Sequence, residues 1–315
     1  MIHLRSSRLV LELDPSNGAK ISSLRSVRSG REWLWSNPWI EHKPSTVTDP
    51  LVRAYRDSGG ADECFPSVVG STTAEGQAVA DHGEAWGVPW KILPSPDGTA
   101  ALFWESADGA WRLERRITAL PDTFHGGFRL AWRLENRGPR EKSWLWAFHC
   151  LLRLEHGMRL DISGETSELR HPAAFDAAGR QVSCPTGRWP MATIDGSDID
   201  LSVIQDPEIK EGSGPAPYAL KSLLRCGPGV SVGLSAPGNQ ERLEIGVPDQ
   251  PEASLAFWRN CRAWKGIPGA SPYFNLGIEP SMGFSDDLAE AVRTDSAVRL
   301  EAGGRREWSL RIGLF

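Results

Sequence analysis

Hydrophobic and polar residues alternate with a period of two along much of this chain. In the clearest segment, 128–135, Phe128, Leu130 and Trp132 share one face, while arginine and glutamate side chains occupy the other. Strict alternation of this kind predicts a β-strand with one buried face. Similar short segments recur at near-even spacing from end to end, separated by Gly-, Pro- and Asp-containing clusters that favour turns.

Helical periodicity is nearly absent, and 287–294 is the best candidate for a short helix. No linker divides the chain and no fixed-period repeat appears. The pattern therefore predicts one all-β, antiparallel sandwich domain over residues 1–315 rather than a propeller. Near the C-terminus, the segments 298–300 and 308–314 flank a glycine pair, which predicts a terminal β-hairpin.

Charge and cysteine usage exclude several classes of partner. The net charge is −5, and lysine and arginine are scattered among acids, which argues against a nucleic-acid partner. No stretch approaches the ~20 apolar residues of a membrane span, and the N-terminal segment lacks the features of a secretory signal. Five cysteines without a CxxC pair favour reduced thiols. We therefore expect a cytoplasmic protein with neither a membrane nor a nucleic-acid partner.

One carboxylate, Glu279, follows an apolar run in the segment 273–287 and directly precedes Pro280. Because proline cannot continue a central sheet ladder, we expect the strand to end at Glu279 or just before it. A strand end would present this charged group to a cleft. The alternative interpretation is an ordinary solvated glutamate at a strand terminus.

Two histidines upstream offer matching chemistry. The segment 142–154 is almost wholly apolar around His149 and predicts a strand buried on both faces, where a structural core histidine is the alternative. The segment 81–90 has no regular period and combines His82 with acids, glycines and two tryptophans, a mixture typical of binding loops. A carboxylate and imidazoles that converge on one cleft suit general acid–base chemistry near neutral pH.

Other catalytic patterns are missing from the sequence. There is no GxSxG elbow, no P-loop and no GxGxxG after a strand, and the histidines lack the HxH or HExxH spacing of a metal site. Fourteen tryptophans stand against three tyrosines. Some of these tryptophans must fill the core, and a surplus near polar loops also suits stacking against sugar rings.

Three segments resemble the aldose 1-epimerases, or galactose mutarotase-like proteins. They are DHGEAWGVPW at 81–90, WAFHCLLRL at 146–154 and FNLGIEPSMGFSDDL at 274–288, and they occur in the order of that family. The resemblance implies a large antiparallel β-supersandwich with very little helix. It also implies an isomerase that interconverts the anomers of a small-molecule sugar by opening the ring, with no metal and no organic cofactor.

The resemblance also assigns roles. Glu279 would take the proton from the anomeric hydroxyl, His149 would give a proton to the ring oxygen, and His82 would stabilise charge as the ring opens. Four further residues are expected to bind the sugar: Asp62, Glu63, Trp86 and Trp258.

The sequence departs from the family at two places. Trp86 takes a position where many relatives have arginine, and Leu151 replaces an aromatic residue after the second histidine. The aspartate that grips the sugar hydroxyls has no clear counterpart; three aspartates in a plausible region are Asp195, Asp198 and Asp200.

The nature of the substrate is open at this stage. Arg53, Arg56 and Arg259 lie in or beside the site segments, but the 81–90 loop has no arginine to hold a phosphate, which favours a neutral sugar. One alternative is a non-catalytic carbohydrate-binding or regulatory protein on the same fold. Another is a hydrolase or lyase, which normally needs a second carboxylate or a tyrosine base.

Overall fold

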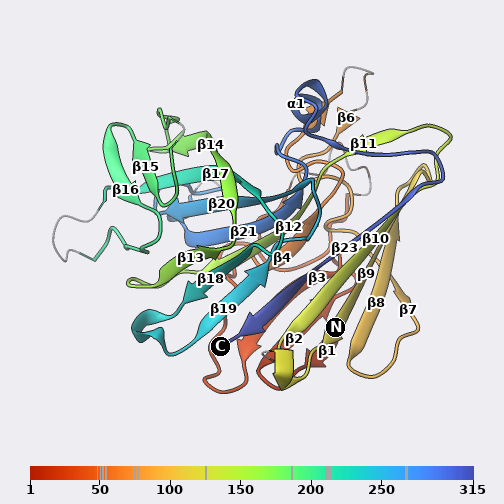
Figure 1. Ribbon diagram of the computed structural model, residues 1–315, viewed down its shortest axis with the longest axis horizontal. Coiled ribbons are helices and arrows are strands. Elements are labelled where there is room, and N and C mark those ends of the chain that lie inside the picture. The colour runs from red at the N-terminus through yellow and green to blue at the C-terminus, as the bar shows by residue number, and fades with distance from the viewer. Residues whose placement is uncertain are drawn as a thin grey trace.

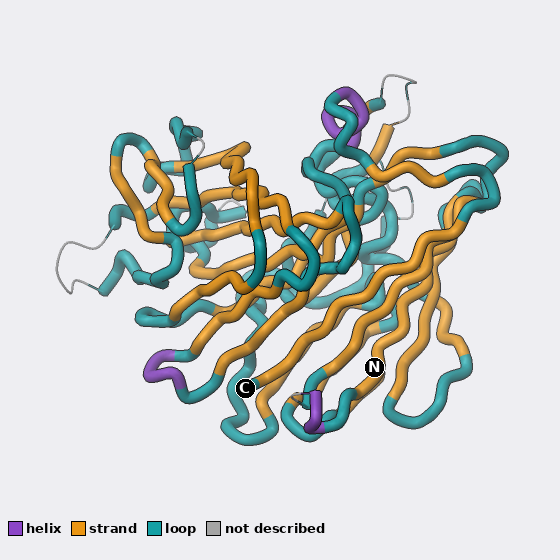
Figure 2. Tube along the Cα trace, in the orientation of Figure 1, coloured by secondary structure: helices purple, strands orange, loops and turns teal. Residues whose placement is uncertain are grey.

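Two large β-sheets make up most of the molecule, as a computed structural model shows (Figures 1 and 2). The structure describes residues 1–315 except 48, 50, 52, 54, 74, 75, 77, 125, 186, 210–214, 267 and 268. All pairings between the strands are antiparallel, so the predicted all-β antiparallel sandwich is confirmed. Within the described residues the only α-helix is α1 (Leu288–Arg293), and Asp287 caps its N-terminus.

The nine-stranded sheet has the order β1-β2-β3-β4-β12-β21-β20-β17-β14. Its strands are β1 (Ile2–Arg5), β2 (Leu9–Asp14), β3 (Lys20–Ser26), β4 (Ala61–Cys64), β12 (Trp146–Arg153), β21 (Phe274–Met282), β20 (Ala253–Cys261), β17 (Tyr218–Cys226) and β14 (Thr166–Phe175).

The eight-stranded sheet has the order β13-β18-β19-β23-β10-β9-β8-β7. Its strands are β13 (Arg159–Ser163), β18 (Ser231–Ser235), β19 (Arg242–Gly246), β23 (Arg305–Leu314), β10 (Phe128–Asn136), β9 (Trp111–Ala119), β8 (Thr99–Glu105) and β7 (Lys91–Leu93). Three short ribbons complete the fold: β5 (Ser71–Thr72) with β6 (Ala78–Val79), β11 (Lys142–Trp144) with β22 (Val298–Leu300), and β15 (Met191–Ile194) with β16 (Ser197–Asp200). Two short 3-10 turns, η1 (Asp122–Phe124) and η2 (Pro237–Asn239), lie in connections.

The main core lies between the two large sheets. On β10, Phe128, Leu130 and Trp132 are buried in one cluster with side chains from the opposite sheet, as the alternation predicts. On β21, Leu276 and Ile278 point into the same cluster. Gly277, which lies between them, and Glu279, which follows them, therefore face the other side of the nine-stranded sheet. No helix among the described residues is long and apolar enough to cross a membrane.

Two sequence predictions about strands need correction. The apolar segment 142–154 is not one strand but two, because Leu145 separates β11 from β12 and donates its N–H to the carbonyl of Pro66. The predicted C-terminal hairpin is also wrong: β22 pairs with β11, whereas β23 pairs with β10 and β19. Local turn chemistry suggested a hairpin, but pairing with more distant strands took precedence.

The prediction that the strand ends at Glu279 is wrong as well, because β21 continues to Met282. Its pairing with β20 is unbroken and sets Pro280 opposite Leu255. Toward β12, pairing occurs on either side but skips Glu279 and Pro280. The missing proline N–H therefore coincides with a gap in only one of the two ladders, which is how a central strand accommodates the proline. Glu279 consequently lies in the middle of a sheet.

Candidate active site

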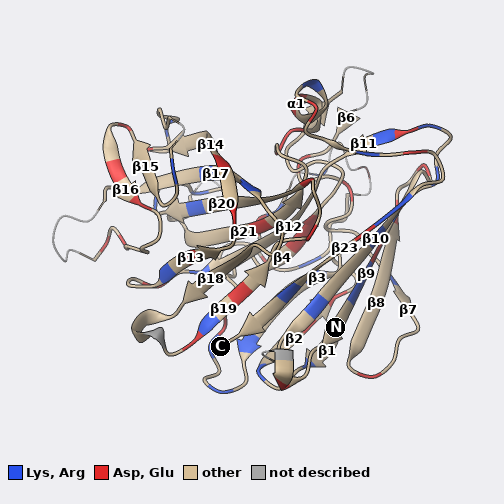
Figure 3. Cartoon of the chain, viewed as in Figure 1, with Lys and Arg blue, Asp and Glu red and all other residues tan. Residues whose placement is uncertain are grey.

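Three of the predicted polar residues form a row across neighbouring strands. On β4 and β12, Asp62 pairs with His149. The register between β12 and β21 is the same on both sides of the gap, so His149 lies opposite Glu279. Because side chains alternate along a strand, all three point away from the second sheet. Figure 3 marks the acidic positions of β4 and β21 near the middle of the nine-stranded sheet.

A cavity of about 420 Å³ lies over this part of the sheet. Its polar lining comprises Asp57, Asp81, His82, His149, Lys221, Glu279 and Asp286. Its aromatic lining comprises Tyr55, Phe175, Trp258, Trp264 and Tyr273. The cavity therefore combines titratable groups with aromatic rings, which is the usual composition of a small-molecule site.

Glu279 is fully buried and its two oxygens have different surroundings. Oε2 accepts a hydrogen bond from Lys221 Nζ at 2.7 Å. Oε1 has no hydrogen-bond partner, and His149 Nε2 lies 3.7 Å from it. The lysine thus fixes one oxygen of the carboxylate and leaves the other available to a ligand.

Lys221 bridges two carboxylates, because its Nζ also lies 3.2 Å from Asp286 Oδ2. Burial alone would lower the pKa of Lys221, but the charges of Asp286 and Glu279 outweigh it and raise the pKa. Burial raises the pKa of Asp286, and the charge of Lys221 partly opposes that. The ammonium group therefore stays charged, and it holds the carboxylates of two different segments together.

His149 is almost fully buried, and its Nδ1 has no hydrogen-bond partner. Burial lowers the pKa of His149 well below its usual value, and the nearby charges of His82 and Lys221 lower it further. The imidazole is therefore neutral near pH 7. A neutral imidazole retains one N–H donor, which it can offer to a ligand oxygen.

His82 stacks on the ring of Tyr55, with the centroids 3.4 Å apart and the planes within 1°. Its Nδ1 lies 3.1 Å from Asp81 Oδ1, and its ring centroid lies 5.3 Å from that of His149. The next residue, Gly83, has a φ of +74°, and a Cβ there would lie 2.0 Å from the carbonyl oxygen of Phe65. Only glycine fits this position, so the His-Gly pair fixes the path of the loop.

The charge state of Asp81 suits its contact with His82. Burial acts to raise the pKa of Asp81, but the hydrogen bond from His82 and the charge of His82 outweigh it and lower the pKa. Asp81 therefore remains a carboxylate. Because a carboxylate can only accept, His82 Nδ1 is the donor of the hydrogen bond between them.

The predicted sugar-binding residues are distributed differently. Trp258 lines the cavity. Asp62 lies beside it rather than in its lining, and its Oδ2 pairs with the buried Lys20 Nζ at 2.5 Å. Trp86 is buried behind Tyr55, with ring centroids 5.0 Å apart, and donates its indole N–H to the carbonyl of Asp81. Both residues support the cavity wall from outside it.

Glu63 does not lie at the cavity, contrary to the expectation of a sugar contact. It points to the opposite face of β4 and is fully buried between the sheets. Its carboxylate pairs with Arg115 Nη1 at 2.6 Å and accepts indole hydrogen bonds from Trp132 and Trp146. Adjacent residues in a strand face opposite sides, so Asp62 and Glu63 could not both contact one ligand.

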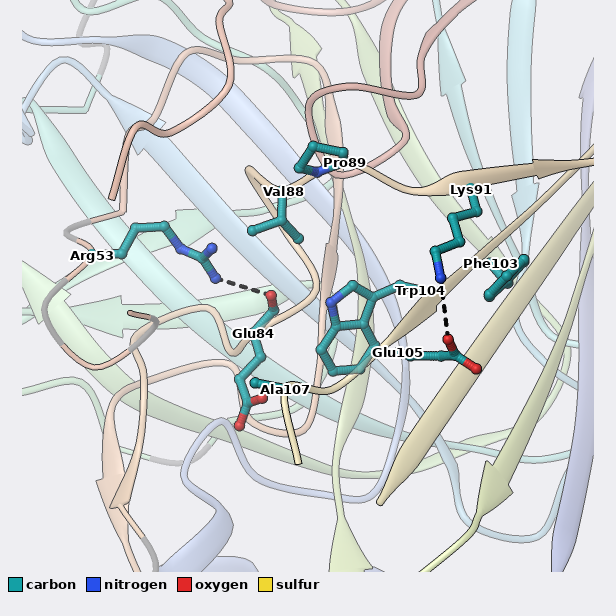
Figure 4. Close-up of a pocket in the computed structure, with 9 residues that line it drawn as sticks. All are labelled: Arg53, Glu84, Val88, Pro89, Lys91, Phe103, Trp104, Glu105 and Ala107. Atoms are coloured by element: carbon teal, nitrogen blue, oxygen red, sulfur yellow. Dashed lines mark hydrogen bonds and ion pairs between the residues drawn. The ribbon is translucent and has the colours of Figure 1, made fainter. Parts of the chain in front are cut away.

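The arginines considered for phosphate binding also lie elsewhere. Arg259 donates to the carbonyls of Leu201 and Val203 in the core. Arg53 donates to the carbonyl of Glu84 and lines a separate cavity of about 260 Å³ (Figure 4). Of the lysines and arginines that the structure describes, only Lys221 lines the larger cavity.

The three aspartates proposed for gripping sugar hydroxyls lie on the β15–β16 hairpin and its end. Asp195, Asp198 and Asp200 are exposed and are not part of the cavity lining. Asp57 lines the cavity instead, and its Oδ1 has no hydrogen-bond partner. Burial raises the pKa of Asp57 from its ordinary 3.8 to about 6.

Sequence reasoning missed Lys221, Asp57, Tyr55 and the place of Asp286 in the cavity lining. The sequence offered one usable signal, the proximity of Asp286 to the Glu279 segment. In the described part of the chain, no group of three or more His, Cys, Asp or Glu residues is arranged to hold a metal ion.

Comparison with known proteins shows similarity of structure but not of sequence. Neither a protein-family model nor a curated protein sequence matches this chain. A galactose mutarotase-related enzyme from Lactobacillus acidophilus superposes with a TM-score of 0.65 at 15% identity, over 100% of this chain and 97% of that one. A galactose mutarotase-like protein from Lactobacillus casei gives 0.60 at 15% identity, over the whole of both chains. A galactose mutarotase-like protein from Clostridium acetobutylicum gives 0.56 at 12% identity, over 98% and 93%. The chain thus has the galactose mutarotase-like fold, which confirms the fold expected from the three sequence segments.

Proposed function

We propose that this protein is an aldose 1-epimerase-like isomerase that interconverts the two anomers of an uncharged sugar. The observation that carries the proposal is the pairing of His149 with the unpartnered Oε1 of Glu279, 3.7 Å from it, in a cavity walled by aromatic rings. The fold shared with galactose mutarotase-like proteins supports the proposal.

In the proposed reaction, Glu279 Oε1 takes the proton of the anomeric hydroxyl. The bond between the anomeric carbon and the ring oxygen breaks, a carbonyl group forms, and the ring oxygen gains a proton from the imidazole side of the site. Rotation about the bond next to the carbonyl exposes its other face. The same steps in reverse return the proton to the imidazole side and close the ring as the other anomer.

The two histidines divide the role of the acid. A neutral His149 can donate a hydrogen bond to the ring oxygen, but loss of its only ring proton would leave an unstable anion. His82 is better placed to carry the extra proton, because the Asp81 carboxylate lies 3.1 Å from its Nδ1. We therefore assign the proton to the pair of imidazoles as one unit, with His149 in contact with the sugar.

The charge of the cavity supports an uncharged substrate. Four carboxylic acids line it, Asp57, Asp81, Glu279 and Asp286, whereas Lys221 is already shared between two of them. A phosphate or carboxylate on the sugar would meet net repulsion there. The neutral hydroxyls of a sugar can donate hydrogen bonds to these oxygens without that cost.

The test is the rate of anomer interconversion for freshly dissolved single-anomer sugars, followed by polarimetry or NMR exchange. Glu279→Gln keeps the shape of the side chain but removes its proton-accepting power, so turnover should fall by about 10² to 10⁴ while sugar affinity changes little. His149→Asn should lower turnover similarly, and the two losses should not add, since both residues serve one step. Glu301→Gln, on an exposed turn, is the matched control and should leave turnover unchanged.

Two outcomes would contradict the proposal. Unchanged turnover in Glu279→Gln, with a sugar that the wild type accelerates, would remove Glu279 from the mechanism. Acceleration of no sugar by the wild type, together with measurable sugar binding, would favour a carbohydrate-binding or regulatory protein on the same fold.

A further inference from the structure

Tyr55 lines the cavity, yet the proposed chemistry gives it no role. It contacts both imidazoles of the site, face to face with His82 and edge to face with His149. We propose that Tyr55 is a positioning residue, which holds the ring of His82 at the angle and distance from His149 that the proton transfer needs. This inference rests on the proposed function for the reaction that it serves, whereas the placement of the His82 ring can be measured without any reaction.

The other contacts of His82 are too weak to fix its ring. Its Nδ1 bonds to Asp81 at 3.1 Å, but the side chain of that aspartate is 52% exposed. Contacts of this kind contribute little, because water competes for both groups. The backbone of His82 has a φ of +58°, and Gly83 fixes the path of the loop. Neither feature restrains rotation of the imidazole about its own side-chain bonds.

Stacking on Tyr55 supplies the missing restraint. The ring centroids of Tyr55 and His82 lie 3.4 Å apart and the planes are within 1°, so the two faces are in contact. A change in the plane of the imidazole would separate those faces and lose the contact. The ring of His149 is nearly perpendicular to both, at 85° to Tyr55 and 84° to His82. Tyr55 therefore sets the orientation of one imidazole relative to the other.

Tyr55 is itself held from two sides. Trp86 packs against it in a T-shaped contact at 5.0 Å and donates its indole N–H to the carbonyl of Asp81. The same indole thus contacts the ring of Tyr55 and the loop that carries the histidine. On the other side, the phenol donates to Asp62 Oδ2 at 3.4 Å, and the buried Lys20 pairs with that oxygen. The stacked ring is therefore anchored to two neighbouring parts of the fold.

Tyr55 does not supply the proton itself. Burial raises the pKa of Tyr55 well above its usual value, and the charges of Asp62 and Asp57 raise it further. The phenol therefore stays protonated near pH 7, and its hydroxyl is directed at Asp62. Its contribution passes through the position of His82 rather than through its own ionisation.

The test compares Tyr55→Leu with Tyr55→Phe in the anomer interconversion assay. Leucine removes the flat face, so kcat should fall by about 10- to 100-fold, the effect of a misplaced catalytic group. KM should stay within about threefold, because His82 acts in the transition state. Phenylalanine keeps the ring and loses only the 3.4 Å hydrogen bond, so it should retain most of the wild-type kcat. Phe103→Leu, a half-buried ring on β8 outside the lining of this cavity, is the matched control and should change neither constant.

Two measurements show whether the effect passes through His82. In a His82→Ala background, Tyr55→Leu should cost no further rate, because the group that it positions is absent. In NMR spectra, the ring protons of His82 should lie upfield of those of His3, whose side chain is 63% exposed, since the His82 ring lies over a phenol face. The upfield shift should persist in Tyr55→Phe and disappear in Tyr55→Leu. All spectra are recorded at one alkaline pH, so that protonation does not contribute.

The outcomes separate this inference from the proposed function. Wild-type kcat in Tyr55→Leu, an equal loss in Tyr55→Phe, or a further loss in the His82→Ala background would overturn the positioning role and leave the isomerase intact. If the wild type accelerates no sugar, the isomerase proposal fails, and the NMR shifts still decide whether Tyr55 orients His82. Thermal unfolding checks each variant, and Tyr55→Met takes the place of Tyr55→Leu if the leucine variant does not fold.

Discussion

Replacement of Lys221 by methionine tests how the candidate site is held together. The variant keeps the length of the side chain but removes the ammonium group from two carboxylates, Glu279 at 2.7 Å and Asp286 at 3.2 Å. Glu279 has no exposed side-chain surface, and that of Asp286 is 17% exposed, so water cannot replace the lost cation effectively. Removal of one partner from a buried ion pair typically costs about 3–5 kcal/mol of unfolding free energy.

The assay is urea and thermal unfolding at pH 7.5. For a chain of this size, each kcal/mol corresponds to roughly 2–4 °C in Tm, so a fall of roughly 6–20 °C is expected. The double variant Lys221→Met with Glu279→Gln should recover part of the loss, because it also removes one of the two uncompensated charges. Lys142→Met, at a partly exposed lysine 3.7 Å from Asp108, is the control and should cost no more than about 1 kcal/mol.

Catalysis supplies a second readout for the same variant. Without Lys221, Glu279 loses the contact that fixes Oε2, so turnover should fall even under conditions where the variant is folded. Wild-type stability in Lys221→Met, with no gain in the double variant, would refute the reasoning that a buried cation compensates these carboxylates.

Two further predictions concern the cavity. The pKa of Asp57 is raised from 3.8 to about 6 in the folded protein. The protonated carboxyl group therefore contributes its full unfolding free energy below pH 3.8, and this contribution is lost as the pH rises through 6. Above pH 6, Asp57→Asn should therefore exceed the wild type in unfolding free energy by at most about 3 kcal/mol, an upper bound because solvent reaches part of Asp57, and near pH 4 the two should be equal. Urea unfolding across that pH range measures the difference. Asp97→Asn, in an exposed turn, is the control and should show no such pH dependence. Gly277→Ala would place a Cβ 2.9 Å from Glu279 Oε1, so turnover should fall at least tenfold with the fold retained. In the control Gly246→Ala, the new Cβ has its nearest neighbour at 3.5 Å, and turnover should not change. Equal activity in both variants would show that the position of Oε1 is not critical.

The alternation of side chains predicted much of the fold, because one face of each long strand meets the core. It worked for β10, where Phe128, Leu130 and Trp132 are all buried. It failed where pairing partners decide the outcome. Pro280 ended the predicted strand. In the structure β21 continues past it, because the pairing with β20 is unbroken and only the pairing with β12 has a gap there.

The candidate site was predictable to the extent that its residues lie in recognisable segments. His82, His149 and Glu279 were identified and they converge on one cavity. Lys221 gave no local signal, since it lies in an ordinary strand sequence and acquires its partners only through the order β17-β20-β21. Glu63 was misplaced because two adjacent acids look equivalent until the strand that orients them is known.

The position of β21 within the sheet has a consequence for how the protein is made. This strand is near the end of the chain, yet it is inserted between β12 and β20, which are joined only through it. During synthesis, β12 leaves the ribosome with this edge unpaired until residues 154–273 have been added, whereas β20 waits only for the connection 262–273. Unpaired strand edges are the usual starting points of aggregation. Nascent or C-terminally truncated chains should therefore depend on chaperones far more than the finished protein, and a ribosome-stalled chain ending before residue 270 should remain protease-sensitive around β12 and β20.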